Sequence, residues 1–261
     1  MVINEYFFLL LIIFSIAIAG WKTSNLSLSG AVMAIMVGMA IGWSYGFEGL
    51  FILGVFFLSS SIWSRLFKKS KIGIEERLAK TSIRDWQQVL ANGGPAALFA
   101  IFFSVTGSEV WTLAFIASIA GANADTWASE IGPLSHKMPF SIRTFRRVPK
   151  GTSGAVSVLG TVAAFFGAAL ISLASLILLN VMDVSLLLLL LLSGFLGNIL
   201  DTVLGAFIQL EYRCTVCDLR TESSVHCDHH TERTKGLPLM NNETVNALSS
   251  LFAGVLMLIF Y

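Results

Sequence analysis

The sequence predicts an all-α membrane protein, a polytopic bundle of about eight transmembrane helices that forms a single domain over residues 1–261. Two observations predict this class. Hydrophobic residues make up 55% of the chain, whereas charged residues make up only 13%. A soluble domain of this length needs a far more polar surface. The net charge of +1 is small, so we expect membrane lipids and no nucleic acid as partners.

Eight apolar segments divide the chain, and most approach the roughly 20 residues needed to cross the hydrocarbon core. They cover residues 3–20, 28–44, 47–66, 86–106, 110–132, 153–180, 184–208 and 240–260. The first segment has no basic start of the kind that precedes a cleaved signal, so we expect a retained helix. The fourth contains Asn92-Gly93-Gly94-Pro95, which predicts a broken helix of the kind that often lines binding sites.

Basic residues predict the orientation of the bundle. All 17 Lys and Arg residues fall in alternate loops, and three long loops hold all of them but Lys22. The opposite loops and the N-terminus contain only acidic charges. Basic loops favour the cytoplasm, so we expect an integral protein of the cell (plasma) membrane with both termini outside. The charge run over residues 65–84 is typical of a solvated or headgroup-binding segment.

Carboxylates inside two of these segments predict a buried site. Asp125 lies about 12 Å of helix from the inner end of the fifth segment, and Asp201 lies about 11 Å from that of the seventh. Intramembrane acids are functional by default, and carboxylate oxygens suit Mg²⁺. We therefore predict that Asp125 and Asp201 hold Mg²⁺ and act in catalysis with Glu130. The spacing of Gly194, Gly197, Asp201 and Gly205 predicts close helix contact around the second acid.

Amide side chains are expected beside these acids. Asn123 shares a helix face with Glu130, and Asn242 and Asn246 share a face at the start of the eighth segment. Asn241, just before them, is predicted to be the helix cap. We predict that Asn123, Asn242 and Asn246 contact the substrate or nucleotide.

A Gly-rich stretch, PKGTSG, opens the sixth segment as drawn from hydrophobicity. The free amides and dipole of a helix N-terminus favour an anion. We therefore predict a phosphate site, although the stretch is not a Walker A loop. Its predicted residues are Arg147, Lys150, Gly151, Thr152, Ser153 and Gly154. A metal beside a phosphate site is the combination that phosphoryl transfer needs.

The long loop over residues 209–239, expected in the cytoplasm, reads CTVCDLRTESSVHCDHH and contains all three cysteines of the chain. A disulfide is not expected in that compartment. The spacing instead predicts a structural zinc site formed by Cys214, Cys217, His226 and Cys227. Because His226 and Cys227 are adjacent, both can ligate only across a tight turn, and His229 or His230 is the alternative to His226. The competing interpretation is an exposed loop with reduced thiols.

The motifs NADTWASEIG, PKGTSGAVSVLGT, GFLGNILDTVLGA, the Cys/His loop and NNETVN follow one another in this order. In them the chain resembles the membrane family of transmembrane protein 19 and chloroplast phytyl-phosphate kinase, over nearly all of residues 120–250. The resemblance implies phosphorylation of an isoprenoid monophosphate to the diphosphate by a nucleoside triphosphate, with CTP favoured by analogy to related lipid kinases. Carried over motif by motif, it points to Asn123, Asp125, Glu130, Gly151, Thr152, Ser153, Asp201, Asn242 and Asn246.

Two other functions fit parts of the pattern. A cytidylyltransferase that activates a lipid phosphate would use the same metal and phosphate groups. A lipid or small-molecule transporter would also carry intramembrane acids, but it predicts polar residues throughout the membrane. Here they concentrate on one side, which favours an enzyme.

Overall fold

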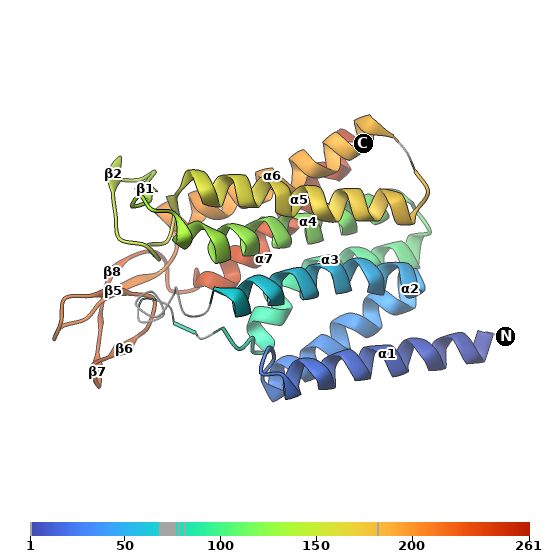
Figure 1. The fold of residues 1–261 in the computed structure, drawn as a ribbon, viewed down its shortest axis with the longest axis horizontal. Helices are drawn as coiled ribbons and strands as arrows, with labels where there is room; N and C mark the ends of the chain where they lie inside the picture. Colours follow the sequence, from blue (N-terminus) through green and yellow to red (C-terminus); the bar gives the residue numbers. More distant parts are fainter. Residues whose placement is uncertain (1, 68–76, 78, 81, 182) are drawn as a thin grey trace.

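The computed structural model describes residues 2–67, 77, 79–80, 82–181 and 183–261, and within them the protein is a bundle of seven helices (Figure 1). The basic residues Lys68, Lys69 and Lys71 lie outside the described residues. All the helices except α4 are long and apolar enough to cross a membrane. The helices are α1 (Val2–Lys22), α2 (Leu28–Leu66), α3 (Trp86–Thr106), α4 (Val110–Ile131), α5 (Val158–Leu178), α6 (Val184–Phe207) and α7 (Asn242–Phe260).

Helix α2 contains two of the predicted segments, 28–44 and 47–66, which is why the structure has seven helices where eight were expected. Gly46 has φ 59° and ψ −139°, outside the helical region, in a conformation that glycine adopts without steric cost. Arg65 lies in the last turn of α2, and Asn25 lies just before the first turn of the same helix. Arg65 Nε donates to Asn25 Oδ1 at 3.0 Å. The two arms of α2 therefore fold back on each other, as Figure 1 shows.

The predicted break in the fourth segment is wrong. Helix α3 continues through Pro95 without interruption. Asp85 and Gln88 form a capping box at its start, and Asn92 Nδ2 donates to the Gln88 carbonyl at 2.9 Å. A proline removes one backbone donor, and neighbouring helices in a membrane bundle let the helix continue past it.

The predicted start of the sixth segment at residue 153 is also wrong. Helix α5 begins at Val158 and is capped by Ser157, whose Oγ accepts from the Gly160 amide. Before it lies a small antiparallel sheet of β1 (Phe140–Ser141), β2 (Arg146–Arg147) and β3 (Ala155–Val156), in the order β2-β1-β3. Gly151 and Gly154 have φ of 82° and 72°, so the PKGTSG stretch forms a turn and does not open a helix.

The loop over residues 209–239 folds into short antiparallel strands. Strands β4 (Glu211–Arg213), β5 (Arg220–Thr221) and β8 (Glu232–Lys235) form one sheet in the order β5-β4-β8. Strands β6 (Val225–His226) and β7 (His229–His230) form a hairpin. All the strands lie at one end of the bundle, and both termini lie away from that end (Figure 1).

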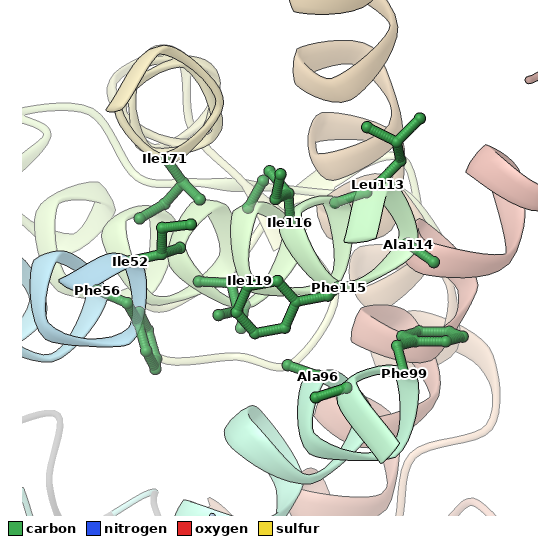
Figure 2. Packing of buried hydrophobic residues seen from close by; sticks show 14 of the residues in the cluster. Ile52, Phe56, Ala96, Phe99, Leu113, Ala114, Phe115, Ile116, Ile119 and Ile171 are labelled. Atoms are coloured by element: carbon green, nitrogen blue, oxygen red, sulfur yellow. The ribbon is translucent and has the colours of Figure 1, made fainter. Parts of the chain in front are cut away.

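Helix α4 is the centre of the bundle and contacts α2, α3, α5, α6 and α7. Every residue from Thr112 to Ala124 is buried. Figure 2 shows Ile116 and Ile119 of α4 among Ile52, Phe99 and Ile171 of the surrounding helices. Lipid tails are as apolar as these side chains, so close van der Waals packing is what holds such helices together.

The predicted small-residue stripe on α6 makes close helix contacts. A Cβ added to Gly194 would lie 2.7 Å from Ala120 Cβ on α4, and one added to Gly197 would lie 3.0 Å from Ala253 Cβ on α7. Only glycine allows this approach, which brings α6 against both α4 and α7.

We predict that Gly194→Val destabilises the bundle by about 1–3 kcal/mol, because the added side chain overpacks the contact with α4. Thermal unfolding in detergent measures the effect. Leu192→Val, at a half-exposed position of the same helix, is the control and should melt like the wild type. Equal melting temperatures for the two variants would contradict the contact.

Candidate active site

A cavity of about 350 Å³ lies at the strand-bearing end of the bundle. Its walls are the last turns of α2, α4 and α6, the first turns of α3 and α7, the 150–154 turn and part of the 79–84 loop. Eight charged side chains line it. They are the carboxylates Asp125, Glu130, Asp201, Glu222 and Glu243 and the cations Lys80, Arg84 and Lys150.

Asp125 and Asp201 lie within hydrogen-bonding reach of each other, as their matched depths predict. Asn198 Nδ2 donates to Asp125 Oδ1 at 3.3 Å, and Ser249 Oγ donates to Asp201 Oδ2 at 3.1 Å. With its amide nitrogen turned toward the acid, Asn246 also donates to Asp201 Oδ2 at 3.1 Å. Two like charges this close disfavour each other, and a proton or a cation between them would relieve the repulsion.

Glu130 lies in the same cavity and accepts a hydrogen bond from Ser64 Oγ at 2.8 Å. Arg84 acts on it electrostatically. Burial lowers the pKa of the Arg84 guanidinium, and the negative charge of Glu130 opposes that shift. Arg84 Nη1 also donates to Ser61 Oγ at 3.2 Å. A half-buried cation is therefore held on one wall, facing the acids.

The 150–154 turn forms another part of the cavity wall. Gly154 packs so closely on α6 that an added Cβ would lie 2.2 Å from the Ala206 nitrogen. Ser153 Oγ donates to Glu222 Oε1 at 2.9 Å, and Thr152 Oγ1 donates to the Pro149 carbonyl at 2.8 Å. The turn therefore lines the cavity as predicted, although it is not a helix start. Asn242 lines it as well, and Asn241 caps α7 as expected.

Glu222 is a cavity residue that the sequence did not indicate. It comes from the Cys/His loop and accepts from Ser153 Oγ, from Gln209 Nε2 at 2.8 Å and from the Ala79 backbone. Burial raises its pKa, and the hydrogen bond from Ser153 counteracts this. It therefore joins the loop, the turn and the end of α6. A lone acid in an irregular segment has no periodicity that could have marked it.

Two further cavity residues were not predicted from the sequence, Lys80 in the loop before α3 and Asn198 on α6. Lys80 bridges Asp85 at 2.8 Å and Glu243 at 3.1 Å. Asn198 lies three residues before Asp201 on α6, and this spacing was a signal that could have found it.

Two predicted contact residues lie elsewhere. Asn123 is fully buried. Its Oδ1 accepts from Ser59 and Ser60, and its Nδ2 donates to the Gly167 carbonyl at 2.7 Å. Arg147 is exposed on β2, outside the cavity wall, and donates to the Met138 carbonyl. The structure gives Asn123 a packing role, so its predicted substrate contact is wrong, and Arg147 does not reach the cavity.

Cys214, Cys217, His226 and Cys227 come together, with ligand atoms that all lie within 4.8 Å of one another. The required tight turn is present, since Cys227 has φ 52° and Asp228 has φ 59°. His229 Nδ1 instead contacts the Cys227 carbonyl at 2.7 Å, so His226 is the histidine of the cluster. Hydrogen bonds from the backbone amides, that of Cys217 above all, lower the pKa of Cys214 to about 6. Three thiols and one imidazole are a donor set that fits zinc.

Comparison with known proteins assigns the chain to a family. Residues 11–254 match the family model described as "Integral membrane protein DUF92". Protein PGR of Arabidopsis thaliana is 33% identical over 92% of this chain and 91% of its own length. An uncharacterized membrane protein of Methanocaldococcus jannaschii is 31% identical over 97% and 92%. "Protein VTE6, chloroplastic" of Arabidopsis thaliana is 29% identical over 54% of this chain and 44% of its own length. No solved structure matches.

We predict that Asn123→Ala lowers the free energy of unfolding by about 1–3 kcal/mol, because it leaves buried hydroxyl and carbonyl groups without partners. Asn242→Ala, in the half-exposed cavity wall, is the matched control and should unfold like the wild type. Thermal melts in detergent compare the two. Wild-type stability of Asn123→Ala would contradict the packing role.

Proposed function

Because the chain belongs to the DUF92 family of integral membrane proteins, we propose that it is a Mg²⁺-dependent membrane kinase. Its substrate would be an isoprenoid monophosphate, converted to the diphosphate by a nucleoside triphosphate, with CTP as the favoured donor. The observation that carries this proposal is the Asp125–Asp201 pair, which shares one cavity with the Gly-rich 150–154 turn. The family resemblance of the sequence motifs supports the choice of acceptor.

The residues present fit Mg²⁺. Asp125 and Asp201 provide adjacent carboxylates from two helices, and Glu130 provides a third oxygen donor in the same cavity. Among the described residues, five carboxylates and three cations line the cavity, and a divalent cation would offset this difference. Mg²⁺ is commonly held by one or two carboxylates together with substrate phosphates. When bound, it would supply positive charge to the phosphates during transfer.

The side chains of the protein would position the reactants. Lys150 and the amides of the 150–154 turn would hold the nucleotide phosphates, since a Gly-rich turn lets backbone N–H groups approach an anion. Arg84 and Lys80, which also line the cavity, would hold the acceptor phosphate. That phosphate is already a nucleophile at neutral pH, so the reaction needs no strong general base. No histidine lines the cavity in the described part of the chain, in keeping with this chemistry.

The position of the cavity supports a site on the cytoplasmic side. It lies at the end that carries the described loops rich in Lys and Arg, and such loops favour the cytoplasm. We propose that this end faces the cytoplasm of the plasma membrane, where nucleotides are available, and that both termini lie outside.

We predict that Asp125→Asn and Asp201→Asn each lower turnover by about a hundredfold or more, because each removes a carboxylate that would hold Mg²⁺, whose positive charge would stabilise the transition state. Purified protein in detergent would receive farnesyl, geranylgeranyl or phytyl monophosphate, labelled CTP or ATP, and Mg²⁺. Asp183→Asn is the matched control, since Asp183 caps α6 at the opposite end.

The product decides between the activities. Label in a prenyl diphosphate, lost in both variants but kept in Asp183→Asn, supports the kinase. A CDP-lipid would move the assignment to a cytidylyltransferase. No transfer with any pair of substrates would favour transport. Wild-type turnover in either variant would remove the metal role.

We also propose that the cluster of Cys214, Cys217, His226 and Cys227 holds a structural zinc. Four protein ligands leave no open coordination position for catalysis. We predict that protein purified without chelator contains zinc, and that Cys217→Ser loses the metal and melts at a lower temperature. His230→Asn, in the adjoining hairpin outside the cluster, should keep both. Metal analysis that finds no zinc in the wild type would contradict the site.

A further inference from the structure

A second pocket, of about 100 Å³, lies between α1, α2 and α3. Its lining is almost wholly apolar and includes Ile13 and Ala17 of α1 and Leu50 and Phe57 of α2. Arg84 and Gln88 line this pocket and also the polar cavity. A half-buried cation, Arg84, therefore borders both spaces.

The position of this pocket suits a ligand that arrives through the membrane. Helix α1 packs mainly against α2 and lies at the edge of the bundle (Figure 1). Helices α1, α2 and α3 are all long and apolar enough to cross a membrane. The pocket therefore lies beside the hydrocarbon, whereas the polar cavity lies at the strand-bearing end.

Among the described residues, the polar side chains that line the pocket are Arg84, Gln88 and Asn92. The Arg84 guanidinium lies 5.9 Å from the ring centroid of Phe57. Asn92, which also lines the pocket, has a buried Oδ1 without a hydrogen-bond partner. An unpaired buried acceptor has an energetic cost. A P–OH group at the junction, or a water molecule that accompanies it, would relieve that cost.

We infer that this pocket holds the phosphate-proximal part of a single isoprenoid chain, with the phosphate of the same lipid at Arg84. The inference rests on the proposed function for the identity of the headgroup. An apolar pocket with a cation at one end is complementary to an anionic amphiphile. Its small volume accommodates one chain and not the two of a diacyl lipid. The phosphate would then face the acids and the 150–154 turn.

Gly54 provides a way to block the pocket. It lines the pocket about one helical turn beyond Phe57, and a Cβ built there meets nothing within 4 Å. Gly54→Leu therefore adds a side chain to the pocket at a position with room for its Cβ. Val32→Phe is the matched control, because Val32 lies on the same helix, is 53% exposed and lies outside the pocket.

The first test compares acceptors of different chain length. For Gly54→Leu we expect KM for geranylgeranyl monophosphate to rise about tenfold, the cost of a poorly fitting hydrocarbon group in an apolar pocket. Dimethylallyl monophosphate has only one isoprene unit to place in the pocket, so its kcat/KM should change less. Val32→Phe should behave like the wild type with both. An unchanged chain preference in Gly54→Leu would overturn the inference.

The second test does not depend on turnover. Geranylgeranyl monophosphate with a photoreactive diazirine in its chain would be cross-linked to the protein in detergent, and the labelled peptides would be mapped by mass spectrometry. We expect label on residues 12–17 and 50–57, competed by unlabelled lipid and absent from Gly54→Leu. Label on other helices would overturn the pocket even if the kinase is active. Label at the expected residues without phosphoryl transfer would keep the pocket and reject the kinase. The wild-type map decides if Gly54→Leu does not fold.

Discussion

The contact between Asp125 and Asp201 is the constraint on which the rest of the site depends. It requires α4 and α6 to approach closely, and Gly194 and Gly197 permit this by leaving no side chain at the crossing. It also requires compensation for two adjacent carboxylates, which amide and hydroxyl donors on α6 and α7 provide in part. The proposed magnesium ion would offset the negative charge that these donors leave uncompensated.

The part of the cavity wall formed by the 150–154 turn depends on the Cys/His loop. Glu222 lies in the chain between Cys217 and His226, two members of the metal-fitting cluster. Its carboxylate accepts from the 150–154 turn and from the end of α6, so a fixed loop geometry also fixes the turn. A structural metal in this loop would thus stabilise the position of the wall that we propose binds phosphate, without contacting any reactant.

Regular spacing decides which features could be predicted from the sequence. Helical rise placed Asp125 and Asp201 at the same depth, and the cysteine spacing identified all four cluster residues, because both arguments use local geometry. The start of α5 was misplaced because hydrophobicity does not register the positive φ of Gly151 and Gly154. Asn123 was misassigned because a polar residue next to a site can serve helix packing. Glu222 and Arg84 come from irregular segments, whose positions only tertiary contacts determine.

The distribution of polar groups argues that a substrate enters and leaves at one side of the membrane. Asp125 lies about 9 Å of helix from Ile119, where the apolar core of Figure 2 begins. That core surrounds α4 over the buried residues toward its other end. The second pocket offers no polar route either, since its polar groups gather at its junction with the cavity. A transporter needs a path that polar groups can follow across the bundle. Among the described residues, the apolar core instead separates the cavity from the other end of the bundle. An amphiphile held at Arg84 would keep its chain in the hydrocarbon while its headgroup reacts.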